Sequence, residues 1–339
     1  MSVVVTGSIA TDQLMSFPGR FREQLIDGQL DVLSVSFLVD DLELRRGGVA
    51  ANIAFGLGQL GHRPVLVGAV GPDFDDYRAW LDRHNVDTSH VRVSATKHTS
   101  RFMCTTDLDQ NQIASFYAGA MAETREIDLA AVAATLDEVD LVIIGAADPV
   151  GMLRHTDYCR DAGVPFAADP SQQLARMDGP DCRRLIDGAT YLFTNEYERE
   201  LLQEKTRWSA DEILRRVDTW ITTKGAKGAR VESPRRHDTI SVNAVPARVQ
   251  GDPTGGGDAF RAGFVSGVAW RLDIERCVQV GCMLATLVVE TVGPQEYVLS
   301  AGEFVDRFAE TYGMRSAVDV ADRVRDAAAA MATLHGQRA

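Results

Sequence analysis

The sequence predicts a three-layer α/β/α fold, in which helices cover both faces of a central, mostly parallel sheet. Short apolar runs alternate with helical patterns along most of the chain, and this alternation is typical of parallel sheets. The length of 339 residues suits one large domain with a small appendage. Two segments interrupt the alternation, and we expect them to form a small β-sheet that projects from the domain as a lid.

The predicted strands are short apolar runs, and they cover residues 3–5, 64–70, 141–144, 165–168, 191–193 and 220–222. The predicted helices between them cover residues 49–60, 73–84, 149–162 and 196–205. In parallel sheets, ligands bind beyond the carboxyl ends of the strands. Polar residues gather at these strand ends, which predicts a composite site from Ser8, Asp12, Asp169, Gln172, Gln173, Asn195 and Thr223.

The two interrupting segments have the features of strands. In the first, residues 33–39 alternate with the period of a strand. In the second, residues 102–106 and 113–117 flank the polar stretch DLDQNQ, as in a hairpin. We therefore divide the chain into an α/β domain (1–12, 46–90 and 120–313) and a β-lid (13–45 and 91–119). An apolar face left over on the lid would favour a homodimer through the lids.

The last segment, residues 314–339, is rich in alanine and carries a helical apolar stripe. The stripe spans two heptads, which is shorter than a coiled coil needs. We expect a peripheral helix, with a partner-binding helix as the alternative. The stripe consists of Val320, Val324, Ala327, Met331 and Leu334.

Composition and charge exclude several classes of function. The net charge of −13 argues against nucleic acid as a partner, whereas ATP is not excluded because local groups decide that contact. The five cysteines form no C-x-x-C pair, which favours free thiols in a reducing, cytoplasmic setting. The first residues, MSVVVTGSIATD, lack the features of a signal peptide. No stretch approaches the roughly 18 apolar residues of a membrane span, so we expect no membrane partner.

The stretch DPTGGGDAFRAGF, residues 252–264, is the most informative motif. Three glycines, Gly255, Gly256 and Gly257, precede a helical pattern, so backbone N–H groups and a helix N-terminus can converge on an anion such as phosphate. Asp258 is poorly placed to bind an anion and well placed to act as a base toward a hydroxyl. That combination indicates phosphoryl transfer to an alcohol. The alternative is a glycine-rich turn with an acidic residue near a helix start.

A second glycine motif, GGVAANIAFGLGQLG, covers residues 47–61. Gly48 and Asn52 lie four residues apart and share one helix face, where Asn52 could bind sugar hydroxyls. The alternative is close packing of the helix on a strand. On the predicted lid, Phe102 and Phe116 could clamp a flat heterocycle, or they could form the core of the lid.

Two further motifs favour a nucleotide and its metal. The stretch TKGAKG, residues 223–228, could hold a nucleotide through its backbone, or it could be a hairpin turn. Asn195 and Glu198 lie three residues apart at a helix start, where Glu198 could orient Mg²⁺ through water. An N-cap with an acidic first turn has the same pattern. Arg261 is either a phosphate contact or an ion-pair partner.

With these motifs, residues 1–312 resemble the ribokinase-like (PfkB) carbohydrate kinase family. The resemblance implies that Gly255 to Gly257 form the anion hole and that Asp258 is the catalytic base. It implies an Mg²⁺-related N-x-x-E at Asn195 and Glu198. It also implies a nucleotide loop T-x-G-x-x-G made of Thr223, Gly225 and Gly228. Gly256 stands where the family often has alanine, which leaves the backbone function intact.

Several stretches, among them TGSIATDQLM, RFMCTTD and ADPSQQLARM, further resemble the bacterial adenosine kinases of this family. That resemblance implies a purine-salvage enzyme that makes AMP from adenosine and ATP with Mg²⁺, and K⁺ is a further candidate cofactor. It implies that Asp12, helped by Gly48 and Asn52, binds the ribose hydroxyls. Phe102 and Phe116 would stack on the purine. The residues implied to surround the nucleoside are Ser8, Ser36, Gln172 and Gln173.

Three other functions are weighed against this one. A PfkB-family kinase for a free sugar, such as ribose or fructose, is the nearest, although a monosaccharide offers no aromatic plane to stack on. A non-catalytic nucleoside-binding regulator would have no need of Asp258 beside an intact anion hole. A nicotinamide-dependent dehydrogenase is disfavoured because the first strand runs into GSIATD in place of G-x-G-x-x-G.

Overall fold

The structure is a computed structural model that describes residues 1–24, 35–235, 238–249 and 251–336. Within these residues, nine strands form a large sheet, parallel from β11 to β5 and antiparallel where β12 and β13 extend it. The predicted mostly parallel α/β fold is therefore confirmed. In spatial order the strands are β13 (Ile240–Val242), β12 (Ala229–Glu232), β11 (Thr219–Thr223), β10 (Tyr191–Asn195), β9 (Phe166–Ala168), β8 (Leu141–Ile144), β1 (Val3–Thr6), β4 (Val65–Val70) and β5 (Val91–Val93).

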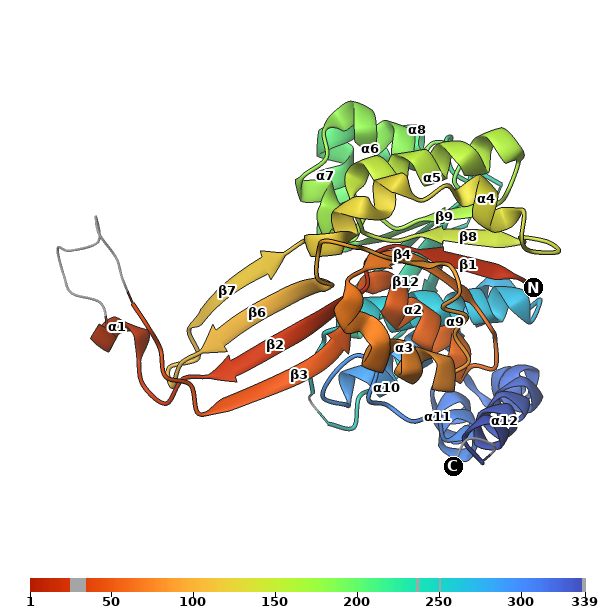
Figure 1. Ribbon diagram of the computed structural model, residues 1–339. Coiled ribbons are helices and arrows are strands. Elements are labelled where there is room, and N and C mark those ends of the chain that lie inside the picture. Colours follow the sequence, from red (N-terminus) through yellow and green to blue (C-terminus); the bar gives the residue numbers. More distant parts are fainter. Residues whose placement is uncertain (25–34, 236–237, 250, 337–339) are drawn as a thin grey trace.

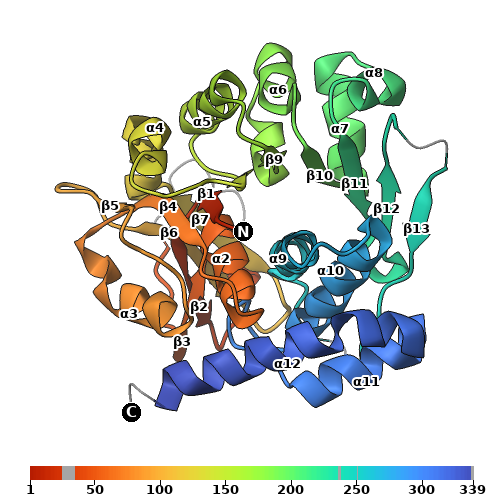
Figure 2. The same cartoon turned by 90° about the vertical axis from the view of Figure 1, so that its right-hand side faces the viewer.

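Helices cover both faces of this sheet. The α-helices are α1 (Phe21–Gln24), α2 (Val49–Gln59), α3 (Asp75–Arg83), α4 (Leu129–Ala133), α5 (Pro149–Ala162), α6 (Gly179–Ile186), α7 (Glu196–Thr206), α8 (Ala210–Leu214), α9 (Gly256–Ala269), α10 (Ile274–Val289), α11 (Ala301–Tyr312) and α12 (Met314–Gly336). Short 3-10 helices are η1 (Pro72–Phe74), η2 (Gly119–Glu126), η3 (Ser171–Ala175) and η4 (Gly225–Lys227). Figure 2 shows α4 to α8 on one side of the sheet and α2, α3, α9 and α10 on the other.

The alternation of side chains along a strand explains why the central strands are apolar throughout. Val3 and Val5 of β1 pack in the core beneath α2, α9 and α10, whereas Val4 packs in the core beneath α5 and α6. Both faces of the strand are buried, so each residue contributes hydrophobic stabilisation. This is why uninterrupted apolar runs predicted these strands.

The lid is a four-stranded sheet within the described residues, and Figure 1 shows it projecting from the body. The hairpin predicted over 102–106 and 113–117 is present as β6 and β7, which pair antiparallel. Strand β2 pairs parallel with β6 and antiparallel with β3. The order across the lid is β3 (Asp41–Gly47), β2 (Ala10–Ser16), β6 (Ser100–Thr106) and β7 (Gln112–Tyr117).

The strand predicted over residues 33–39 is wrong. Residues 33 and 34 lie outside the described residues, and residues 35–39 form no strand. Phe37 instead packs against Phe17 and Phe21, with ring centroids 5.1 and 4.9 Å away, and the side chains of residues 35–39 alternate between half-buried and exposed without forming a strand. The outer strand is β3. The predicted boundary after residue 12 also falls within β2, so Asp12 belongs to a lid strand.

The last described helix, α12, packs along α11 at the edge of the body (Figure 2). Its apolar stripe is buried at Val320, Val324, Ala327 and Met331. All five cysteines are buried and unpaired among the described residues. In that same part of the chain, no helix combines the length and the hydropathy that a bilayer crossing requires.

Candidate active site

Two cavities flank the N-terminus of α9. The first, here called the lid cavity, has a volume of about 490 Å³ and lies under the lid. The second, here called the hairpin cavity, has a volume of about 340 Å³ and lies beside the β11–β12 hairpin. Gly255 lines the lid cavity, whereas Gly256 and Gly257 line the hairpin cavity. The start of α9 therefore separates the two cavities, and the N–H of Gly256 donates to the carbonyl of Pro253 at 3.1 Å.

The backbone conformation before α9 requires a glycine. Gly255 has a φ of +81°, and a Cβ there would lie 2.4 Å from Cβ of Pro294. Gly48, before α2, has a φ of +96°, and a Cβ there would lie 2.6 Å from the backbone oxygen of Ser8. Both positions require glycine. Gly48 therefore allows the close packing of α2 on the neighbouring strand, and it also lines the lid cavity.

The lid cavity gathers side chains from the sheet edge and the lid. The hydroxyl of Ser8 accepts the N–H of Val49 at 3.0 Å, so it also caps α2. Gln173 is buried, and its Oε1 has no hydrogen-bond partner among the described residues, as expected of a group that awaits a ligand. The predicted residues in the lining are Ser8, Asp12, Gly48, Asn52, Phe102, Phe116, Gln172, Gln173, Gly255 and Asp258.

One row of the lid sheet explains how Asp12 and the two phenylalanines meet. In the strand register Asp12 lies between Arg45 on one side and Phe102 on the other, and Phe102 lies opposite Phe116. Directly opposed side chains share a face of the sheet, and these four all line the lid cavity. The row therefore presents a cation, a carboxyl group and two aromatic rings to one ligand.

Ser36 is the predicted residue that the structure does not bring to this cavity. Its side chain is exposed in the segment before β3, apart from the described residues that line the cavity.

Burial raises the pKa of Asp12 to about 6, with Arg45 opposing the rise. Arg45 in turn binds Asp252 at 3.2 Å, which ties the lid to the loop before α9.

Asp258 lies in the first turn of α9 and faces the lid cavity. Its Oδ2 accepts a hydrogen bond from Nδ2 of Asn52 at 2.8 Å. Burial raises the pKa of Asp258 to about 6, while Arg261 and the Asn52 hydrogen bond act against the rise. A carboxyl group with this pKa is ionised near neutral pH and can accept a proton from a hydroxyl.

Of the two roles that the sequence allowed for Arg261, a phosphate contact or an ion-pair partner, the structure shows a buried ion pair. Nη2 of Arg261 lies 2.5 Å from Oδ1 of Asp169, and the side chains of both residues are buried. The ring of Phe193 lies under the guanidinium, 5.6 Å away. Oδ2 of Asp169 has no hydrogen-bond partner among the described residues. The pair fixes the guanidinium of Arg261 beside Gly257 in the first turn of α9.

The TKGAKG stretch is both a hairpin turn and a cavity wall. It connects β11 to β12, which pair antiparallel, and η4 forms its turn. Thr223, Gly225 and Gly228 line the hairpin cavity together with Gly256 and Gly257. The two alternatives therefore coexist, because a tight turn exposes backbone N–H groups toward the cavity.

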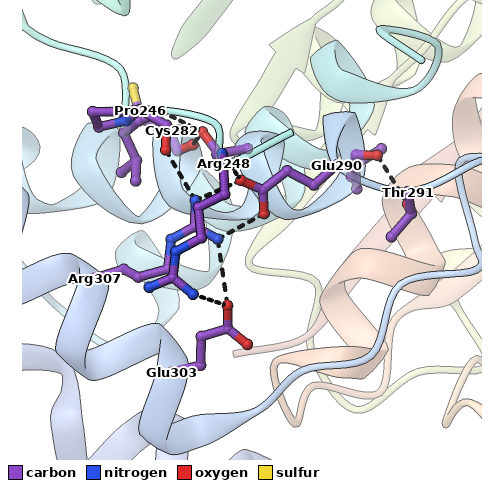
Figure 3. Close-up of polar contacts among 10 residues, drawn as sticks. Pro246, Arg248, Cys282, Glu290, Thr291, Glu303 and Arg307 are labelled. Carbon is purple, nitrogen blue, oxygen red and sulfur yellow. Dashed lines mark hydrogen bonds and ion pairs between the residues drawn. The ribbon is translucent and has the colours of Figure 1, made fainter. Parts of the chain in front are cut away.

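A buried ion-pair network, shown in Figure 3, holds the opposite wall of the hairpin cavity. Arg307 binds both carboxylate oxygens of Glu290, at 2.7 and 2.8 Å, and donates to the carbonyl of Pro246 at 3.0 Å. Pro246 and Cys282 both line the cavity. Arg307 is only 2% exposed, so this network fixes the loop 244–247 against α10 and α11.

Asn195 and Glu198 form the N-terminal capping box of α7. Each side chain accepts the backbone N–H of the other residue at 2.8 Å. Burial raises the pKa of Glu198, and the nearby charge of Asp169 adds to the rise. Neither residue is among the described lining of the two cavities. The capping role is thus present, and Glu198 also lies within the electrostatic reach of Asp258.

The family model described as pfkB family carbohydrate kinase matches residues 23–301. The chain belongs to the pfkB family. This pfkB-family kinase is therefore a phosphotransferase that acts on an alcohol group. The match covers both glycine motifs and the hairpin cavity, whereas Ser8, Ala10, Asp12 and Leu14 of the lid cavity precede the matched residues.

Three similar proteins show which kinds of kinase this pfkB-family kinase resembles. A nucleoside kinase of Methanothermobacter thermautotrophicus is 32% identical over 79% of this chain and 85% of its own. The structure of Burkholderia thailandensis nucleoside kinase in complex with ADP-inosine is 37% identical, with a TM-score of 0.78, over 92% of this chain and 96% of its own. A ribokinase of Bacillus subtilis is 27% identical over 74% of this chain and 83% of its own.

Proposed function

We propose that this pfkB-family kinase transfers the γ-phosphoryl group of ATP to the 5′-hydroxyl of a purine nucleoside, with adenosine as the expected acceptor and AMP as the product. One observation carries the proposal. The carboxyl group of Asp258, a polar strand edge and two aromatic rings line the same cavity, and the start of α9 separates them from a second cavity. Relatives named nucleoside kinases support the same acceptor class.

The chemical step follows from the position of Asp258. Its ionised carboxylate would take the proton of the 5′-hydroxyl as that oxygen attacks the γ-phosphorus of ATP. The new bond forms between the sugar oxygen and phosphorus, and the bond to the ADP oxygen breaks. The N–H groups of Gly255 and Gly257 would stabilise the charge that develops on the phosphoryl oxygens, at about 3 kcal/mol per donor. The N–H of Gly256 donates to the carbonyl of Pro253 at 3.1 Å and would leave that carbonyl to act with them.

Mg²⁺ fits this site through water. Mg²⁺ keeps several waters and takes few protein ligands. In the described residues no group of three or more His, Cys, Asp or Glu could hold a metal directly, which agrees with binding mainly to phosphates. Glu198, with one carboxylate oxygen in the capping box, and the unpartnered Oδ2 of Asp169 would hold its waters. When bound, Mg²⁺ would neutralise the phosphate charge.

The row across the lid accounts for recognition of the nucleoside. Asp12 and Asn52 would bind the ribose hydroxyls, since both line the lid cavity beside Asp258. Phe102 and Phe116 would stack on the base, because aromatic rings prefer flat partners. The ribokinase among the similar proteins keeps a free-sugar kinase as the second candidate, because the polar edge alone would also hold ribose.

Replacing Phe116 by leucine is expected to raise the KM for adenosine by about tenfold, as stacking on one ring contributes about 1–3 kcal/mol per base. The KM for ATP should stay within about twofold, because ATP would occupy the other cavity. Tyr117→Leu is the matched control, since Tyr117 is the next residue on β7 and points to the opposite face. Equal effects of the two variants on adenosine would contradict stacking.

The proposal as a whole is tested by ADP release from Mg-ATP with adenosine, inosine, guanosine, ribose and fructose, each with and without K⁺. We expect turnover to be strongest with a purine nucleoside and adenosine to lead the panel. Turnover with a free sugar alone would keep the fold and Asp258 and would discard the aromatic clamp. ADP release that no acceptor increases would overturn the proposed kinase activity.

We also propose that the chain forms a homodimer through its lids. The face of the lid opposite the cavity carries Leu42 and Leu44 on β3 and Ile113 on β7, exposed by 53%, 65% and 51%. Leu42 lies opposite Met15, and Met15 and Ile113 each lie opposite Thr105, so the apolar residues share one face. A second copy of the lid would cover this apolar face.

Leu44→Glu is expected to convert the dimer to a monomer in light scattering after gel filtration, because it places a charge on the apolar face that the second lid would cover. Val318→Glu, on α12 and similarly exposed at 67%, is the control and should leave the dimer intact. A wild-type monomer at tens of micromolar, or a dimer that persists in Leu44→Glu, would rule out this interface.

A further inference from the structure

A chain of buried and partly buried hydrogen bonds runs from α3 to Asp258 and passes through a residue outside all the motifs. Gln295, in the segment after α10, is 1% exposed. Its Oε1 accepts from Nε1 of Trp80 at 3.1 Å, and its Nε2 donates to Oδ1 of Asn52 at 2.9 Å. Nδ2 of Asn52 then donates to Asp258 at 2.8 Å. Four segments distant in sequence thus meet in one relay.

The direction of every hydrogen bond in this relay is determined. The indole of Trp80 can only donate, so the oxygen of the Gln295 amide must face it. Tyr77 donates its hydroxyl proton to the carbonyl of Gly47 at 2.8 Å and therefore accepts from Nε2 of Gln295 at 2.6 Å. An indole at one end and a backbone carbonyl at the other therefore fix the same amide orientation.

The fixed orientation is passed on to Asn52. Because Gln295 donates an N–H group, Asn52 must accept it with its side-chain oxygen. The amide nitrogen of Asn52 then faces the carboxylate of Asp258. An asparagine with the reverse orientation would set its oxygen against the carboxylate, two acceptors in contact. Without Gln295, nothing in the described contacts of Asn52 would select between the two orientations except Asp258 itself.

The relay is anchored to the body and to the lid. Trp80 stacks on Phe55 with parallel rings, and the guanidinium of Arg46 lies 4.3 Å above its ring. Arg46 and Gly47 both belong to the lid strand β3. The residues that set the orientation of Gln295 therefore include the end of the lid strand that covers the lid cavity.

We infer that Gln295 is a positioning residue for phosphoryl transfer, which orients the Asn52 amide so that it holds the base Asp258 in its ionised form toward the acceptor hydroxyl. This inference rests on the proposed function, in which Asp258 is the base. A hydrogen bond to a carboxylate lowers its pKa, so loss of the orientation is expected to raise the pKa of Asp258.

The other ionisable groups around Asp258 keep their charge state when Gln295 is replaced, because among the described residues the only one that Gln295 contacts is Tyr77, whose pKa is raised by burial and whose hydroxyl stays neutral across the acidic limb. They are Arg261 on α9, Asp169 after β9, Glu198 on α7 and Tyr77 on α3. Arg261 lowers the pKa of Asp258, and the two carboxylates raise it. A change in the pH profile of a Gln295 variant can therefore be assigned to the relay.

The test is the pH profile of kcat and kcat/KM for Gln295→Met, which keeps the length of the side chain and removes its hydrogen bonds. We expect kcat to fall about tenfold or more and the acidic limb to move up by about half to one pH unit, with the KM for ATP within about twofold. Gln279→Met is the matched control, a buried glutamine of α10 bonded to Arg276 and Glu275. Its profile should match the wild type.

Trp80→Phe provides a second variant if Gln295→Met does not fold. It retains a ring for Phe55 and Arg46 and removes only the donor that fixes the amide, so a smaller shift in the same direction is expected. An unshifted acidic limb with kcat within about twofold of wild type in the folded variants would overturn the inference and leave the proposed function standing.

Inactivity of the wild type with every acceptor would overturn the proposed function, and the relay is then judged by thermal unfolding. A carboxyl group whose pKa is raised in the folded state lowers the free energy of unfolding as the pH rises from its ordinary pKa to the raised one. Gln295→Met should extend this loss to higher pH than Gln279→Met does. Identical pH dependence of Tm in the two variants would overturn the relay.

Discussion

Asp258→Ala is expected to lower kcat by about three orders of magnitude, because general base catalysis contributes about 10² to 10⁴ and the variant has no other group at that position. The dissociation constant for adenosine should change by less than about tenfold, since Asp12, Asn52 and the aromatic rings remain. Nucleoside binding is measured by calorimetry and turnover by ADP release. A variant that keeps more than about a tenth of the rate would show that another group is the base.

The pH profile of the wild type provides the companion test. Burial raises the pKa of Asp258 to about 6, and the carboxylate is the active form. The rate should therefore be constant near pH 7.5 and fall as the pH drops through about 6. Asp12 titrates in the same range, so the fall below pH 6 in kcat/KM includes weaker nucleoside binding, whereas kcat at saturating nucleoside isolates Asp258.

Arg261→Met is expected to lower the free energy of unfolding by about 3–5 kcal/mol, because it leaves Asp169 buried without its partner. The pKa of Asp258 should rise as well, since Arg261 is the group that lowers it most. Both effects are measured in one preparation, the first by chemical denaturation and the second by the pH profile of kcat.

Two controls accompany Arg261→Met. Arg276→Met breaks the more exposed pair with Asp319 and should cost less than about 1 kcal/mol. Combining Arg261→Met with Asp169→Asn removes the unpaired charge and should recover part of the stability. If Arg261→Met is no more costly than Arg276→Met, the buried pair does not stabilise the first turn of α9.

The sequence predicted the layers of the body because their signal is local. A strand buried on both faces is apolar throughout, as β1, β4 and β8 are, and it is recognised without knowledge of its neighbours. The outer lid strand was missed because β3, with the sequence DLELRRG, turns one face to a polar cavity and the other to solvent. Its pairing with β2 makes it a strand, and pairing is not local.

The same distinction separates the site residues. Asp258 and its glycines form one short motif, so chemistry at that position could be predicted. Gln295 lies 243 residues from Asn52, and Arg261 bonds a residue 92 positions earlier. No spacing along the chain reports such contacts. Ser36 was placed in the site by resemblance, and the path of the chain before β3 puts it elsewhere.

The most direct test of the central claim is the identity of the phosphorylated product. ATP labelled at the γ-phosphate is incubated with Mg²⁺ and adenosine, and the products are separated by chromatography against 5′-AMP. We predict that the label appears in 5′-AMP in a one-to-one ratio with ADP, and that 5′-deoxyadenosine, which lacks the attacked hydroxyl, gives none. Label recovered only as inorganic phosphate, or only on a free sugar, would contradict the account.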